Sequence, residues 1–228
     1  MSKSDRVPRT PAPLTGALRN ALASVLLLPL LFSVPVQAEE PSCTYTTYKW
    51  STHARAAVEH RTVRHLYSEL QPIEIHSATG CTVCEEDQVA ISVPGIAPFR
   101  VCKLLAQDIR DALIGAMEEG EAIFTVVGYR VGMTRGDVDA VGNRTQFSNH
   151  SFGVAIDVNE RQNGLYHQCP YFGPACRLRR GGNWSPSQRG SLSADSPIVK
   201  ALGRVGLKWG GEIEGDQKDF MHFSPNGY

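Results

Sequence analysis

Neither sign of charge is in excess in this 228-residue chain. Lys and Arg together number 23, Asp and Glu also number 23, and the formal net charge at pH 7 is zero. After residue 38 the balance is slightly acidic, with 19 basic residues against 22 acidic ones, a net charge of −3. Proteins that bind nucleic acid or another anionic polymer usually carry a basic excess. We therefore expect no nucleic-acid partner.

A long apolar run is also lacking. The run from Ala21 to Val34 is short and contains Pro29, whereas a membrane-spanning helix needs about 20 apolar residues. Four basic residues precede it, Lys3, Arg6, Arg9 and Arg19, and Val36-Gln37-Ala38 after it fits a cleavage site of small residues. This arrangement is typical of a signal peptide. We assign residues 1–38 to one and expect an exported protein without stable membrane insertion after cleavage; an uncleaved N-terminal anchor is the alternative.

Cysteine is absent from that leader, and none follows the cleavage site closely enough to indicate a lipoprotein. All six cysteines lie further on, at Cys43, Cys81, Cys84, Cys102, Cys169 and Cys176. An even number in an exported chain indicates disulfide bonds formed in an oxidising compartment. The sequence does not determine the pairing, but we expect Cys169 to pair with Cys176 and close a small loop.

Cys81 and Cys84 have two other interpretations. They are spaced like a redox pair, and with His76 they would form half of a metal site. The redox interpretation requires a thioredoxin-like strand and helix around the pair, which the surrounding sequence does not show. Structural disulfides are therefore the favoured interpretation for these two residues as well.

Helical periodicity occurs in two segments of the mature chain. Apolar residues spaced along one face predict a helix over 54–70, which Pro72 would end. A clearer pattern predicts a second helix over 103–119, with Gly120 just past its end. The length of the chain and its hydrophobic content of 42% fit one globular domain, or two small ones.

Strand-like patterns surround the second of these helices. Residues 88–93 alternate in polarity before a loop over 94–98, and residues 122–129 are typical of a buried strand. We divide the mature chain into two parts after residue 98. Residues 39–98 hold the N-terminal helix and a cysteine-containing segment packed on the core, and residues 99–228 form the core domain.

The stretch from Phe147 to Asn159 brings an imidazole and a carboxylate together on one short segment. It contains the pattern Ser-x-His-x-x-Gly-x-Ala-x-Asp, formed by Ser148, His150, Gly153, Ala155 and Asp157. Zinc binds nitrogen and oxygen donors of this kind well. On one straight strand, an odd separation would send His150 and Asp157 to opposite faces. We therefore expect His150 to lie off a buried strand, with Gly153 available for the bend.

A second pair of donors, Asp219 and His222, lies near the end of the chain. Before it come a long loop over 160–195, rich in Gly, Pro, Arg and Ser, and a short helix that starts at 195–197. The aromatic neighbours of His222 favour a terminal strand. We expect Asp219 in the loop that enters this strand and His222 in the strand itself, so that both converge on one metal ion.

The two motifs, with Trp209-Gly210-Gly211 between them, resemble those of the zinc D-alanyl-D-alanine carboxypeptidase family. Its relatives include phage L-alanyl-D-glutamate endopeptidases and D-Ala-D-Ala dipeptidases. The resemblance covers roughly residues 99–223. It implies an α+β fold of the hedgehog/DD-peptidase type, a small antiparallel sheet with flanking helices, stabilised in this chain by disulfides. It also implies that residues 99–228 are a zinc peptidase core domain.

The resemblance assigns roles to particular residues. It implies that one zinc ion is held by His150, Asp157 and His222. Asp219 would be the catalytic carboxylate, and Arg130, in Gly-Tyr-Arg, would contact the substrate and the developing oxyanion. Residues that support the ligands or contact substrate would be Ser148 and Trp209. The sequence departs from the family after Arg130, because relatives commonly continue with serine and a nearby glutamine, where this chain has Val131-Gly132-Met133.

These residues predict peptide-bond hydrolysis. Three protein ligands leave a fourth zinc position for water, whose pKa zinc brings toward about 7. Asp219 would take the proton of the zinc-activated water. The resemblance implies peptidoglycan stem peptides as substrate, a D,D-carboxypeptidase or endopeptidase reaction, and a monomer in the periplasm or at the cell wall of a bacterium. Arg177, Arg179 and Arg180 either contact anionic stem peptides or form a solvated face.

The alternative is a non-catalytic zinc-binding module of the same fold, acting as a cell-wall or protein-binding domain. Hedgehog signalling domains, which resemble the family, are the precedent. Such a module needs the metal but not a base. The presence of Asp219 favours the enzyme, because a purely structural site does not need an adjacent carboxylate that is not a ligand.

Overall fold

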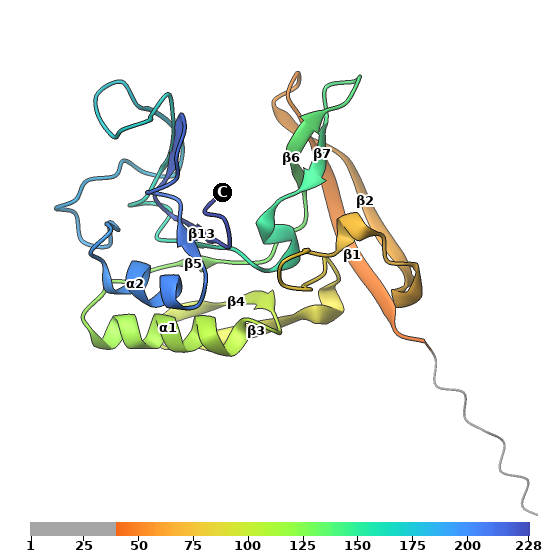
Figure 1. Cartoon of the computed structure of the whole chain (residues 1–228), viewed down its shortest axis with the longest axis horizontal. Helices are drawn as coiled ribbons and strands as arrows, with labels where there is room; N and C mark the ends of the chain where they lie inside the picture. The colour runs from red at the N-terminus through yellow and green to blue at the C-terminus, as the bar shows by residue number, and fades with distance from the viewer. Residues whose placement is uncertain (1–39) are drawn as a thin grey trace, which may run out of the picture. The chain divides into compact units, whose positions relative to one another are not determined.

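Short strands make up most of the regular structure in the computed structural model, which describes residues 40–228 (Figure 1). Within this range there are four small sheets and two α-helices. The α+β class is thus confirmed, while the hedgehog/DD-peptidase likeness stays a prediction. The predicted signal peptide lies outside the described residues. No helix in the described range is long and apolar enough to cross a membrane.

The N-terminal part of this range is a hairpin extended into a four-stranded sheet. Strand β1 (Ser42–Ser51) pairs antiparallel with β2 (Ala56–Leu66). A second antiparallel pair, β6 (Met133–Val138) and β7 (Arg144–Phe147), joins β1 through β6, in the order β2-β1-β6-β7 (Figure 1). These strands place a sheet beside the segment that leads into the His150 motif.

The helix predicted over 54–70 is wrong. Most of these residues form β2, and only a 3-10 turn, η1 (Tyr67–Glu69), follows it. No residue of β2 is buried, so its apolar side chains do not form the buried face that the predicted helix would need. Pairing with β1 satisfies its backbone hydrogen bonds, and this long-range contact overrides the weak local periodicity. The domain boundary predicted after residue 98 stays a prediction. The part before it, residues 39–98, does not contain the predicted helix.

A hairpin and a helix form one side of the core. Strand β3 (Gln88–Val93) is confirmed, but the predicted loop after it is too long, because β4 (Ile96–Cys102) starts directly after a tight turn. Two further 3-10 turns, η2 (Pro72–Glu74) and η3 (Glu85–Asp87), precede this hairpin. Helix α1 (Ala106–Glu118) confirms the clearer helical pattern.

A central antiparallel sheet, in the order β11-β13-β8-β5, carries the residues of interest. It consists of β11 (Lys208–Trp209), β13 (His222–Ser224), β8 (Ile156–Val158) and β5 (Val126–Val127). The buried strand predicted over 122–129 is thus limited to two residues.

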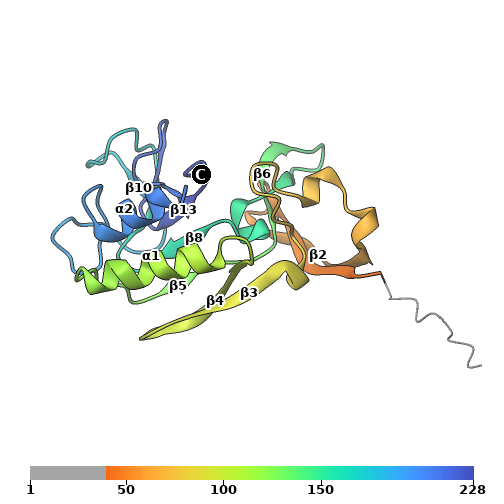
Figure 2. The same ribbon diagram turned by 60° about the horizontal axis from the view of Figure 1, so that its bottom comes forward.

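Two helices pack beside this sheet. Helix α2 (Pro197–Arg204) begins after Ser196, as predicted, and lies side by side with α1 (Figure 2). The core between helices and sheet includes Ile109, Leu113, Ile156, Leu202 and Phe223, all of which are fully buried. This packing makes the central sheet a rigid support for side chains on its other face.

The segment predicted as a loop over 160–195 contains two strands. Strands β9 (Leu165–His167) and β10 (Arg177–Arg180) pair with each other, and β12 (Gln217–Asp219) pairs with the other edge of β9. The loop prediction is therefore wrong for these seven residues. Asp219 ends β12 instead of lying in a loop, while His222 begins β13 as predicted.

Three disulfide bonds use all six cysteines. Cys169 pairs with Cys176, as predicted, and the other bonds are Cys43–Cys84 and Cys81–Cys102. Because Cys81 and Cys84 pair with different partners, they are neither a redox pair nor half of a metal site. Three disulfides favour an exported protein, since such bonds persist in oxidising compartments.

Candidate metal centre

His150 lies on a short 3-10 turn, η4 (Asn149–Phe152), and not on the adjacent strand. Gly153 ends this turn with φ of 65°, a left-handed conformation that favours glycine. A Cβ at this position would also collide with the backbone nitrogen of Cys102. The chain bends here and enters β8 at Ile156. The predicted bend at Gly153, with His150 off the strand, is confirmed.

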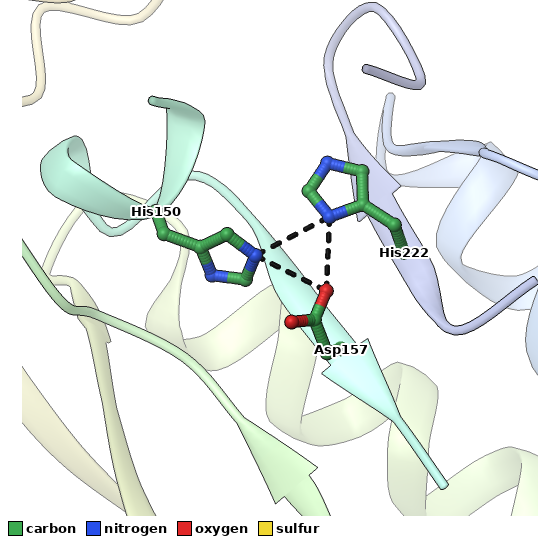
Figure 3. Close-up of side chains that lie close together, drawn as sticks. All are labelled: His150, Asp157 and His222. Atoms are coloured by element: carbon green, nitrogen blue, oxygen red, sulfur yellow. Dashed lines mark hydrogen bonds and ion pairs between the residues drawn. The ribbon is translucent and has the colours of Figure 1, made fainter. Parts of the chain in front are cut away.

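Three side chains, those of His150, Asp157 and His222, converge beside strands β8 and β13 of the central sheet (Figure 3). Asp157 on β8 is directly opposite His222 on β13, so both side chains project from the same face. Asp157 Oδ1 lies 3.1 Å from His150 Nε2 and 3.0 Å from His222 Nδ1, and the two nitrogens are 3.3 Å apart. All three residues are buried.

These three atoms fit the donor set of one divalent ion. Ligand atoms bound tetrahedrally to zinc at about 2.1 Å are about 3.4 Å apart, close to the distances found here. His150 Nδ1 lies 2.9 Å from the carbonyl oxygen of Gly128. An Nδ1–H donated to that oxygen leaves the lone pair of Nε2 for a metal. The group of His150, Asp157 and His222 could therefore hold a metal ion, as the sequence predicts.

Protonation states in the cluster suit metal binding. Burial lowers the pKa of His150 to about 4, so its imidazole is neutral at pH 7. Burial opposes ionisation of Asp157, but the close contacts of its carboxylate with the imidazoles of His150 and His222 outweigh burial and hold the pKa of Asp157 well below its usual value. A neutral imidazole and an ionised carboxylate are the forms that bind a metal.

Asp219 lies in the same pocket but outside the three-residue cluster. It is buried, and its Oδ1 has no hydrogen-bond partner among the described residues. Burial raises the pKa of Asp219 to about 6. The structure thus contains a carboxylate near the cluster that is not one of its three donors and that exchanges its proton near neutral pH.

Trp209 holds the segment that carries Asp219 and His222. Its Nε1 donates to the carbonyl oxygen of Phe220 at 2.8 Å, and the Trp209 ring is buried. Gly210 joins both ends of the segment, because its nitrogen donates to His222 O at 2.8 Å and its oxygen accepts from Asp219 N at 2.9 Å. Trp209 thus holds this segment in place, while its predicted role in the site stays a prediction.

Arg130 contacts the cluster from its outer side. Its Nη2 donates to Asp157 Oδ2 at 2.7 Å, and its Nη1 donates at 3.4 Å to the carbonyl oxygen of Gly128, which also accepts from His150 Nδ1. Ser148 precedes η4, and its Oγ lies 3.3 Å from Ser151 Oγ. Both Arg130 and Ser148 line the pocket that contains the cluster. The two residues are close enough to contact a ligand in this pocket.

Residues 141–225 match the model of the D-alanyl-D-alanine carboxypeptidase family. The family resemblance is confirmed over this part of the chain. The matched part includes the three cluster residues and Asp219, whereas Arg130 lies before it. No curated protein and no solved structure matches the chain. The match thus covers the residues that build the cluster.

The cluster opens into a pocket of about 530 Å³. The walls include residues that the sequence motifs did not identify: Tyr48, Trp50, Arg135, Arg144, Leu165, His167 and Gln217. They come from the sheet that contains β1, β6 and β7 and from the sheet that contains β9 and β12. None of these residues lies within a recognisable motif, so the sequence alone contains no signal for them. Knowledge of how these strands pair would have been needed to place them at the pocket. Arg179 and Arg180 also line the pocket, whereas Arg177 does not.

Proposed function

We propose that the protein is an exported zinc peptidase that hydrolyses peptide bonds in peptidoglycan stem peptides, as a D,D-carboxypeptidase or an endopeptidase. One observation carries the proposal: the cluster of His150, Asp157 and His222 shares its pocket with Asp219, a carboxylate outside the donor set. The match to the D-alanyl-D-alanine carboxypeptidase family supports both the peptidase reaction and the substrate class.

The chain's own residues define where the ion would be held. His150 Nε2, Asp157 Oδ1 and His222 Nδ1 are the donor atoms, and all belong to buried side chains. A bound zinc ion supplies a Lewis acid that polarises a carbonyl group and lowers the pKa of water toward about 7. The opposed positions of Asp157 and His222 on paired strands fix two of the donors before any ion binds.

Asp219 is the proposed general base and acid. With a pKa raised to about 6 by burial, it is mainly ionised at neutral pH and can accept a proton from the attacking water. Its unpaired Oδ1 is the atom that would take this proton. The same carboxyl group can then donate to the leaving amine, because its pKa is close enough to neutrality for both transfers.

Arg130 is the proposed electrostatic partner of the substrate. Its guanidinium is anchored on Asp157 and is about one-third exposed. A guanidinium has five N–H donors, so the anchor leaves others for a substrate oxygen. Fixed donors of this kind stabilise negative charge that develops on the scissile carbonyl.

Digestion of defined muropeptides tests the proposal. The zinc-loaded protein is incubated with stem peptides, and the products are analysed by mass spectrometry. We expect cleavage of one stem-peptide bond by the wild type, and the product masses identify which bond. Metal binding without cleavage of any stem bond would contradict the peptidase proposal and favour the non-catalytic zinc-binding module.

A further inference from the structure

Positive charge is concentrated in the pocket of a chain that is otherwise slightly acidic. Five arginines line it: Arg130, Arg135, Arg144, Arg179 and Arg180. Only two carboxylates, Asp157 and Asp219, line the same pocket. Residues 39–228 nevertheless carry 22 acidic against 19 basic residues. A local excess of one sign within a concave site attracts ligands of the opposite sign.

Three of these arginines already have partners. Arg130 is paired with Asp157 at 2.7 Å. Arg180 makes two hydrogen bonds to the carboxylate of Glu160, at 2.7 and 3.1 Å. Arg144 donates to the carbonyl oxygen of Gly136. These contacts fix the three guanidinium groups and use part of their capacity to bind a ligand.

Arg135 and Arg179 are different. Within residues 40–228, neither makes an ion pair with a carboxylate, and unlike Arg144 neither donates a side-chain hydrogen bond. Arg135 belongs to β6 and Arg179 to β10, so they reach the pocket from two separate sheets. Among the described residues, all five N–H donors of each of these two guanidinium groups are therefore free for an anion.

Irregular strand pairing directs both arginines into the pocket. The β9–β10 register shifts between Leu178 and Arg180, so Arg179 has no partner across the sheet. In a regular strand, Arg179 and Arg180 would point to opposite faces, but here both line the pocket. The β6–β7 register also shifts on both sides of Arg135, which itself stays paired with Gln146.

Both arginines act on the same region of the pocket. Burial lowers the pKa of His167, and the charges of Arg179 and Arg135 lower it further. Burial also lowers the pKa of Arg135, against the effect of Asp219 and Asp157. A partly desolvated cation is costly unless an anion accompanies it. Asp219 and Asp157 act on Arg135 without pairing with it directly, so we expect a ligand to supply the direct counter-ion.

We propose that Arg135 and Arg179 bind a carboxylate of the substrate close to the scissile bond, so that the protein selects acidic peptides over their amidated counterparts. The inference rests on the proposed peptidase function. A guanidinium binds a carboxylate through two parallel hydrogen bonds, and a neutral carboxamide cannot replace it in this contact. Arg135 is the main determinant, because it is half-buried in the pocket whereas Arg179 is exposed, and Arg179 contributes from the opposite sheet.

Paired synthetic peptides test this proposal. The two members differ only in a carboxylate or a carboxamide beside the scissile bond, and kcat/KM is measured for each with the zinc-loaded full chain. We expect the wild type to prefer the acidic peptide at least about tenfold. Arg135→Gln is expected to lose about tenfold on the acidic peptide and less than about twofold on the amide. An equal loss on both peptides, or no preference in the wild type, would overturn the proposal.

Arg64→Gln is the matched control. Arg64 is exposed on β2, in the same sheet as Arg135, and does not line this pocket. It should behave as the wild type on both peptides. Arg135→Lys keeps the charge without the forked geometry and should recover part of the preference. A loss of preference in Arg64→Gln as large as in Arg135→Gln would contradict a local role for Arg135.

A binding measurement separates this inference from the proposed function. Calorimetry with the zinc-loaded Asp219→Asn variant compares the affinities of the same two peptides. If neither peptide is cleaved by the wild type but the acidic one binds more tightly, and Arg135→Gln abolishes the difference, the carboxylate site stands and the peptidase proposal fails. If both peptides are cleaved and bound equally, the peptidase proposal stands and the carboxylate site fails.

Discussion

Asp157 and His222 face each other across the paired strands β8 and β13, with Nδ1 of His222 3.0 Å from Oδ1 of Asp157. This relationship depends on strand register, because a slip of one residue would turn one of the side chains to the opposite face of the sheet. The core packed beneath the sheet opposes such a slip, since Ile156 and Phe223 are the adjacent paired residues and both are fully buried. Burial of these neighbours thus positions the donors.

Replacement of the proposed base should separate metal binding from catalysis. Asp219→Asn removes the group that accepts the proton of water but changes none of the three donors. We expect a loss of about 10²- to 10⁴-fold in kcat, with an unchanged zinc content by mass spectrometry of the metal. Full activity in this variant would show that another residue is the base.

The pH dependence of activity should reflect Asp219. Because burial raises the pKa of Asp219 to about 6, the carboxylate required to accept a proton is lost as the pH falls through this value. We expect log(kcat/KM) to decline with a slope of about one below pH 6 and to level off above it. The measurement is a pH–rate profile at saturating zinc. The same acidic limb in Asp219→Asn would exclude Asp219 as its origin.

The bend after η4 should be sensitive to substitution. Gly153→Ala places a Cβ at positive φ and against the backbone nitrogen of Cys102, so we expect a loss of at least about 2 kcal/mol in unfolding free energy. Zinc affinity should fall as well, because His150 lies on the displaced turn.

Gly80→Ala is the control for that substitution. Gly80 also has positive φ, but a Cβ there meets no atom within 4 Å. We expect a loss of about 1 kcal/mol from backbone strain alone and an unchanged zinc affinity. Equal destabilisation in the two variants, measured by chemical denaturation, would show that the close approach at Gly153 has no consequence.

The disulfide bonds should differ in their contribution to stability. Cys43 and Cys84 are 41 residues apart, whereas Cys169 and Cys176 are 7 apart. Loop-closure entropy therefore predicts a loss of about 4 kcal/mol when the first bond is removed by paired Ser substitutions, and of about 2.5 kcal/mol for the second. Urea unfolding of the two variants checks the order. A larger loss for the short loop would show that chain entropy does not dominate.

The metal donors could be predicted from the sequence because they lie in two compact motifs. The odd spacing of His150 and Asp157 already required a bend, and Gly153 was the residue able to form it. The roles of Asp219 and Arg130 rest on family resemblance and stay predictions. The structure adds that both residues share the pocket of the donors.

The pocket walls could not be predicted in the same way. Arg135 and Arg179 face the pocket because of register shifts in β6–β7 and β9–β10, and register depends on residues far away in the sequence. The helix expected over 54–70 failed for a related reason, since β2 depends on its pairing with β1. Local periodicity contains no information about such partners.

Zinc titration of the metal-free protein tests the central claim most directly. Calorimetry should give one zinc ion per chain, and His222→Ala should weaken this binding by more than about 100-fold, because it removes a donor and not only an outer partner. The exposed His53→Ala variant, which lies outside the cluster, should bind zinc as the wild type does. Absence of saturable zinc binding, or equal affinity in His222→Ala and the wild type, would contradict the account.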